Sequence, residues 1–191
     1  MIISADTHDE IALQLCSRVT YDAKESTYAR SLADQFVKLY AEETSDTGTY
    51  GALVGKYAIR RDDVQLFETA SSVIVKTAGA GFFLGAEPAL SGIVAIGVAV
   101  LTMLRRLWVR GVLLDNDKVA VLSILLANQE SGHKYGLTAQ QLLDILNREQ
   151  LIYKLNWLEN VLNELSAEPT PDGDSAELAS SDELGRWRCH A

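Results

Sequence analysis

The feature that most constrains this chain is an almost uncharged segment in its middle. Between Lys76 and Arg105 lie 28 residues, of which only Glu87 carries a charge, and Gly, Ala, Val and Leu predominate. Glu87-Pro88 predicts the start of a helix with proline in its first turn, and the apolar pattern then continues from Ala89 to Leu104. A helix this apolar must be buried, either inside the protein or in a lipid bilayer.

We favour the hypothesis that this helix, 88–104, is the centre of a soluble helical domain, wrapped by amphipathic helices. The alternative is a membrane-associated effector that inserts the apolar segment 78–104. The uncharged run Pro88 to Leu104 is 17 residues long, which is near the lower limit for a span. Arg105, Trp108 and Arg110 then follow, as at a cytoplasmic membrane boundary.

Small residues along this helix predict a close contact with a neighbour. Ser91, Ala95 and Ala99 stand four positions apart, which places them on one face and would let another helix approach closely. Val98 lies in the middle of the same helix and would be buried under both hypotheses. The helix-packing or membrane candidates are therefore Ser91, Ala95, Ala99 and Val98.

The residues before this segment predict an all-α domain over 1–114. Thr7 to Glu10 fits a capping box at the start of a first helix. Residues 42–51 are expected to form a loop, and a further helix is expected to begin at Asp62 or Asp63. Apolar residues recur at helical spacing through all three helices: Ile11, Leu15 and Val19; Ala29, Leu32, Phe36, Leu39 and Tyr40; and Val64, Phe67, Ala70 and Ile74.

From Asp117 the chain predicts three short helices and a final strand. Thr138 is expected to cap the second helix, within the phrase GLTAQQLLDIL, and residues 185–189 alternate as in a strand. This order of elements over 115–191 resembles a winged-helix domain. The acidic segment 166–184 departs from that pattern because it is too long for a tight wing, so we expect a mobile loop there.

The charge distribution bears on the partner of this winged-helix-like domain. The chain has 26 acidic and 17 basic residues, a net charge of -9, and its last predicted helix offers Lys154 alone against Glu159 and Glu164. Phosphate backbones would be repelled, so we expect a protein partner of basic character, or a second copy of this chain, rather than nucleic acid. A DNA-binding regulator is kept as the second alternative, because Asn156 and Asn160 could contact base edges.

Large apolar residues in this domain are the predicted contact points. Trp157 and Leu158 on the last helix and Trp187 on the final strand are expected to anchor a partner, since tryptophan is enriched at binding hot spots. Glu159 and Glu164 would steer a basic partner toward them.

No arrangement of residues in the sequence predicts reaction chemistry. The glycines of Gly51 to Lys56 and of Gly79 to Gly85 have the wrong spacing for phosphate-binding loops. Three histidines and two cysteines lack the local spacing of a metal site. We therefore expect a mainly α, non-catalytic adaptor or regulatory subunit without cofactor or metal, acting through protein-protein contacts. Because Met1 to Glu10 has no features of a leader peptide, we expect it in the cytoplasm, with membrane association as the alternative.

Overall fold

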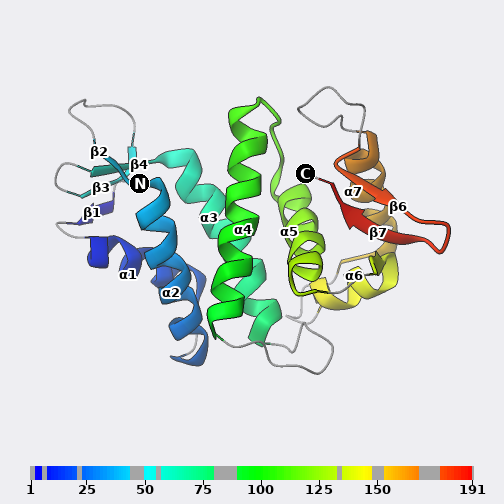
Figure 1. The fold of residues 1–191 in the computed structure, drawn as a ribbon, viewed down its shortest axis with the longest axis horizontal. Helices are drawn as coiled ribbons and strands as arrows, with labels where there is room; N and C mark the ends of the chain where they lie inside the picture. Colours follow the sequence, from blue (N-terminus) through cyan, green and yellow to red (C-terminus); the bar gives the residue numbers. More distant parts are fainter. Residues whose placement is uncertain are drawn as a thin grey trace.

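The protein is mainly α-helical, as predicted from its sequence. The computed structural model describes residues 3–5, 8–20, 23–43, 50–54, 57–79, 90–132, 135–147, 153–167 and 177–190 (Figure 1). The helices of these residues are α1 (His8–Val19), α2 (Ala23–Tyr40), α3 (Arg61–Gly79), α4 (Leu90–Val109), α5 (Asn116–Glu130), α6 (Ala139–Leu146) and α7 (Leu155–Ala167). The strands are β1 (Ile3–Ala5), β2 (Glu42–Glu43), β3 (Tyr50–Val54), β4 (Tyr57–Arg60), β5 (Leu137–Thr138), β6 (Ala179–Ser181) and β7 (Arg186–Cys189).

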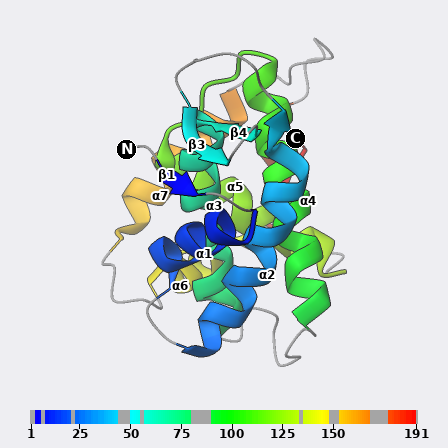
Figure 2. The same ribbon diagram turned by 90° about the vertical axis from the view of Figure 1, so that its left-hand side faces the viewer.

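A four-stranded sheet at one end of the N-terminal helices corrects the prediction of an all-α domain over 1–114. Its strand order is β1-β3-β4-β2, with β1 parallel to β3 and the other pairs antiparallel (Figure 2). The strands are two to five residues long, so they carry too few side chains for a periodic signal. β1 also pairs with a strand almost fifty residues away, which no local pattern reveals. Thr7, the predicted cap of α1, lies outside the described residues.

Helices α1 to α4 pack around a shared apolar core. The rings of Phe36 on α2 and Phe67 on α3 lie 4.6 Å apart at the centre of this contact. The predicted stripes are buried except at Leu39, which is 53% exposed and therefore does not belong to the core.

The small-residue strip of α4 does not face a close neighbour, contrary to the prediction. Ser91 and Ala95 are exposed and Ala99 is half-buried, as is Val98. The residue that allows close approach is Gly97, which is buried, and a Cβ atom placed on it would overlap the Cδ1 atom of Leu32 on α2. The sequence pattern placed the contact on the wrong face of α4, because small residues occur on both.

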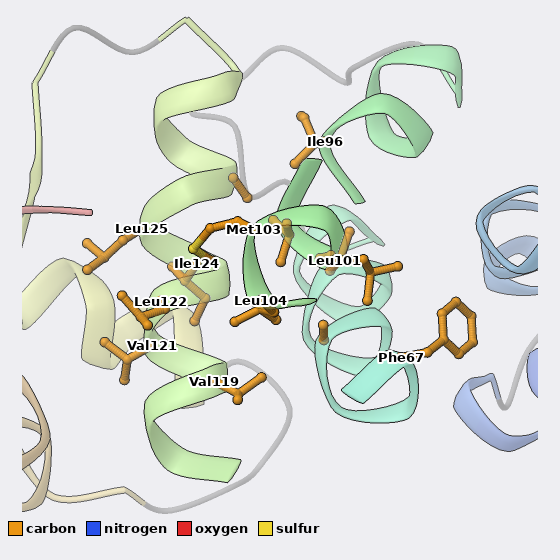
Figure 3. Close-up of a cluster of buried hydrophobic side chains, with 14 of the residues drawn as sticks. Phe67, Ile96, Leu101, Met103, Leu104, Val119, Val121, Leu122, Ile124 and Leu125 are labelled. Carbon is orange, nitrogen blue, oxygen red and sulfur yellow. The ribbon is translucent and has the colours of Figure 1, made fainter. Parts of the chain in front are cut away.

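The helix buried on all sides is α5, and α4 is buried on one face only. α5 packs against α3 and α4 on one side and against α7 and β7 on the other. Figure 3 shows Met103 and Leu104 of α4 turned toward α5, whereas Val121 and Leu125 of α5 point away from α4. The buried residues of α5 therefore go round the whole helix: Val119, Val121, Leu122, Ser123, Ile124, Leu125, Ala127 and Asn128.

The C-terminal elements form a compact unit around α5. Their order is α5-β5-α6-α7-β6-β7, and β7 lies between β5 and β6 in an antiparallel sheet. Thr138 caps α6 as predicted, and Gln141 completes a capping box with it. Part of the predicted loop 166–184 is ordered, because α7 continues to Ala167 and β6 covers Ala179–Ser181; residues 168–176 lie outside the described part.

One apolar cluster crosses the predicted domain boundary at residues 114 and 115. It contains buried residues from every helix α1 to α7, with α5 as the shared element. A hydrogen bond adds a polar link across the same boundary, since the Thr69 hydroxyl group of α3 donates to Asn116 Oδ1 of α5 at 3.4 Å. The two predicted domains therefore share a single core.

Candidate docking surface

The outer face of α7 is polar and carries no basic side chain. The core side of the helix buries Leu158, Val161, Leu162 and Leu165, with a 3.6-residue period. The opposite side exposes Asn156, Asn160 and Asn163, and the exposed Glu159 and Glu164 flank this row. Sequence analysis identified Asn156 and Asn160 but not Asn163, although the spacing of four and three residues puts all three on one face.

Leu158 is a core residue and not a partner contact, contrary to the prediction. It is 0% exposed, because it belongs to the buried stripe of α7. Glu159 is exposed as expected. Glu164 is 60% exposed and forms an ion pair with Lys118 of α5, with Nζ and Oε2 3.2 Å apart.

The two tryptophans of the C-terminal unit both pack against its core. Trp157 is half-buried, stacks on Tyr153 with ring centroids 4.4 Å apart, and donates from Nε1 to the Asp117 carboxylate at 3.1 Å. Trp187 lies opposite Leu137 in the sheet and is also half-buried. The buried part of each tryptophan therefore belongs to the core of the unit. Partner binding through their exposed edges stays a prediction.

A hollow of about 330 Å³ opens beside the start of α7. Its apolar wall is formed by side chains of α3, α5 and α6 and by one residue two positions before α7: Val73, Ala120, Ile124, Ile145, Leu146 and Tyr153. Polar side chains of α3 and α5 also line it: Glu68, Thr69, Ser72, Lys76, Asn116 and Asp117. A concave apolar wall with a few polar groups can accept one large side chain of a partner.

A second hollow, of about 280 Å³, adjoins the first and shares Thr69 and Asn116 with it. Thr69 donates from its hydroxyl group to Asn116 Oδ1 at 3.4 Å, between the two hollows. Leu113, which is 77% exposed, lies at the second hollow. Sequence analysis missed both hollows because each is assembled from elements distant in the sequence.

The turn between β6 and β7 adds acidic surface to the unit. Asp182 accepts hydrogen bonds from the backbone N–H groups of Arg186 and Leu184, each at 2.9 Å, and forms an ion pair with the Arg186 side chain. The hydrogen bond from the Arg186 backbone, followed by that from its side chain, holds the pKa of Asp182 below its ordinary value. This carboxylate is therefore ionised at neutral pH and orders the turn.

Candidate groups for metal or redox chemistry do not gather in the described residues. No three His, Cys, Asp or Glu side chains among them are placed to share a metal ion. Cys16 and Cys189 are buried and not joined in a disulfide, and the Cys189 thiol lies 4.0 Å from the sulfur of Met103.

Comparison of the chain with protein-family models, with curated proteins and with solved structures finds no match in any of the three.

Proposed function

We propose that the protein is a non-catalytic adaptor or regulatory subunit whose C-terminal unit docks a basic protein partner. The observation that carries this proposal is the absence of Lys and Arg from α7, whose outer face exposes asparagines flanked by Glu159 and Glu164. The element order α5-β5-α6-α7-β6-β7 supports a winged-helix-like unit with α7 in the position of a recognition helix. A recognition helix without lysine or arginine cannot neutralise the phosphates of DNA. A protein partner therefore fits this surface better than DNA.

The hollow at Tyr153 supports the same proposal, because it offers a place for one apolar anchor residue of the partner. Interfaces take most of their binding energy from a few large side chains that enter such hollows. Asp117, which lines the hollow, and Glu159 on the outer face of α7 would then face basic groups of the partner, which raises the association rate and makes it fall with salt.

Affinity capture with the full chain and two charge-reversed variants tests this function. Glu159→Lys changes the outer face of α7, and Glu130→Lys makes the same change at the exposed end of α5. We expect a captured partner to be reduced several-fold by Glu159→Lys and to be retained by Glu130→Lys. Equal capture by all three proteins would contradict docking on α7.

Titration with random duplex DNA at low salt tests the second alternative in parallel. We expect dissociation constants weaker than about 10 µM for the wild-type chain, since its C-terminal unit is acidic. Binding at micromolar concentration or tighter with a steep salt dependence, together with no capture that depends on Glu159, would favour the DNA-binding regulator.

Membrane insertion of α4 is a second candidate function, favoured by one observation. The helix Ser91–Val109 has a mean hydropathy of 1.7 and is long enough to span a bilayer, with 44% of that window buried inside the protein. Insertion would require α4 to leave its contacts with α2, α3 and α5. Leu101 and Leu104 of α4, which are buried in these contacts, would then face lipid. Recovery of the expressed protein in a carbonate-washed membrane pellet would support insertion.

A further inference from the structure

The outward face of α4 is uncharged over most of its length. Ser91 and Ala95 are exposed, and Val98, Ala99 and Thr102 are half-buried on the same face, at spacings of three and four residues. This stripe runs for about 17 Å along the helix. Figure 1 draws α4 between α3 and α5, and the view turned by 90° in Figure 2 places it at one edge of the molecule. Helix faces that meet water are ordinarily lined with charged and polar residues, so this face lacks the composition of a solvated surface.

The stripe ends in a hollow of about 260 Å³ that combines arginines with exposed aliphatic side chains. Leu39 of α2 is 53% exposed and Val109 of α4 is 68% exposed, and both line the hollow. The remaining lining comes from the same two helix ends: Tyr40, Thr102, Arg105, Arg106 and Arg110. Arg106 is exposed and has no ion pair within the part of the chain that the structure describes.

The charge around this hollow contrasts with that of the rest of the chain. Residues 115–191 contain 13 acidic and 6 basic residues, a net charge of -7. The lining of the hollow contains Arg105, Arg106 and Arg110 and no acidic residue. Arg105 pairs with Asp63, which is 2% exposed and does not line the hollow. The end of the molecule that carries the apolar stripe is thus locally basic.

Stabilisation of the α4 C-terminus explains only part of this arrangement. Basic side chains at the C-terminal end of a helix complement its dipole, which accounts for Arg106 in the last turn of α4 and for Arg110 directly after it. The dipole does not account for two exposed aliphatic side chains beside them, or for the uncharged stripe that leads to them. Apolar residues bordered by arginines are instead the composition of a surface that contacts lipid headgroups.

We propose that α4 and the end of α2 form a peripheral docking surface for a membrane that contains anionic lipids. Arg106 and Arg110 contact the phosphate of the headgroup, while Leu39, Val109 and the α4 stripe rest on the acyl boundary. The core face of α4 stays packed, so the protein binds the surface without inserting. This goes beyond the proposed adaptor function, since it places the adaptor on a membrane surface. The membrane contacts α4, and the acidic docking face on α7 belongs to a different part of the molecule.

Co-sedimentation of the full chain with vesicles of defined composition tests the proposal. At low salt we expect binding to vesicles of phosphatidylcholine with 30% phosphatidylglycerol, and none to phosphatidylcholine alone. Arg106→Glu/Arg110→Glu should weaken binding at least about tenfold. Lys154→Glu/Arg188→Glu changes the net charge equally on exposed residues of the C-terminal unit and should weaken it less than about threefold.

A second pair of variants tests the apolar contact. Leu39→Gln removes an exposed aliphatic side chain of this surface, and Leu113→Gln removes one that lies elsewhere. We expect several-fold weaker vesicle binding for Leu39→Gln and unchanged binding for Leu113→Gln. If the double arginine variant fails to fold, Arg106→Gln/Arg110→Gln and the salt dependence of the wild-type chain provide the same comparison.

Several results would overturn the proposal. The first is absence of binding to anionic vesicles at low salt, and the second is equal binding to anionic and neutral vesicles. The third is an equal loss of vesicle binding in the Arg106/Arg110 and Lys154/Arg188 double variants. The fourth is bound protein that stays with the membrane through a carbonate wash, which would indicate insertion. Binding of polyglutamate that depends on Arg106, without vesicle binding, would assign the surface to an acidic protein instead. Glu159→Lys should leave vesicle binding intact, so failure here and failure of docking on α7 can be told apart.

Discussion

Three side chains from three helices meet where α4 approaches its C-terminal end. Asp63 of α3 is 2% exposed and accepts a hydrogen bond from Arg105 Nη1 of α4 at 2.7 Å. The same guanidinium group lies over the ring of Tyr40 on α2, 4.7 Å from its centroid. A buried carboxylate is stable only while its cation is present, so this cluster holds α2, α3 and α4 in register.

Loss of Arg105 should therefore destabilise the protein. We expect Arg105→Met to lower the free energy of unfolding by about 3 kcal/mol, because Asp63 is left buried without its cation. Arg106→Met, at the next residue, is the control and should change the free energy of unfolding by less than about 0.5 kcal/mol. Urea unfolding measures this free energy for both variants. Asp63→Leu/Arg105→Met should recover part of the loss, and a stability of Arg105→Met equal to that of wild type would refute the account.

Tyr40 gives this cluster a dependence on alkaline pH. Burial raises the pKa of its hydroxyl group above 10.0, although a hydrogen bond with Thr102 and the charge of Arg105 oppose the shift. The unfolded chain then loses the tyrosine proton at lower pH than the folded chain. The stabilisation is complete below pH 10 and is lost as pH rises through the folded pKa.

The prediction from this shift is a difference between two proteins. From pH 9 to pH 11, the unfolding free energy of the wild type should fall more steeply than that of Tyr40→Phe, which has no group to ionise at this position. Urea unfolding at three pH values provides the comparison. Parallel pH dependences would show that ionisation of Tyr40 is not linked to folding.

At the scale of elements, the packing of α4 depends on Gly97 and not on the predicted strip of small residues. Gly97 faces Leu32, which is 1% exposed in the core, so a larger side chain at this position must displace a well-packed neighbour. Ala95, two residues earlier, faces outward and is exposed. The two positions give opposite expectations for the same substitution.

We expect Gly97→Leu to lower the unfolding free energy by at least about 2 kcal/mol through overpacking. Ala95→Leu should change it by less than about 0.5 kcal/mol, since its side chain projects away from the core. Thermal and urea unfolding measure both variants. Adding Leu32→Ala to Gly97→Leu should restore part of the stability. If Ala95→Leu lowered the unfolding free energy more than Gly97→Leu, α4 would be rotated about its axis relative to this structure.

At the scale of the whole molecule, α5 joins the N-terminal helices to the C-terminal unit. Its buried residues face α3 and α4 on one side and α7 and β7 on the other, so neither part keeps a complete core without it. Trp157 on α7 and Trp187 in β7 both belong to the C-terminal unit, whereas Trp108 lies on α4, so a chain that keeps Trp187 alone reports on the C-terminal unit.

The shared core predicts one cooperative unfolding transition. In a chain whose only tryptophan is Trp187, made by Trp108→Phe/Trp157→Phe, urea unfolding followed by fluorescence should coincide with unfolding followed by circular dichroism. The same agreement is expected in the presence of Ile124→Ala, with both midpoints lowered, since Ile124 is 1% exposed on α5. Two separate transitions would restore the interpretation of independent domains.

The sequence by itself determined the helical class, the positions of the main helices, the cap at Thr138 and the excess of acidic over basic residues on the last helix. These properties depend on residues close together in the chain, where spacing and side-chain type are sufficient. The tertiary structure alone decided that Leu158 is core, that Gly97 faces Leu32 and that α5 is the helix buried on all sides. It also decided the four-stranded sheet, the hollow beside Tyr153 and the gathering of Leu39, Arg106 and Arg110. Each of these depends on contacts between residues distant in sequence, because which face of a helix or strand is covered depends on its neighbours in space.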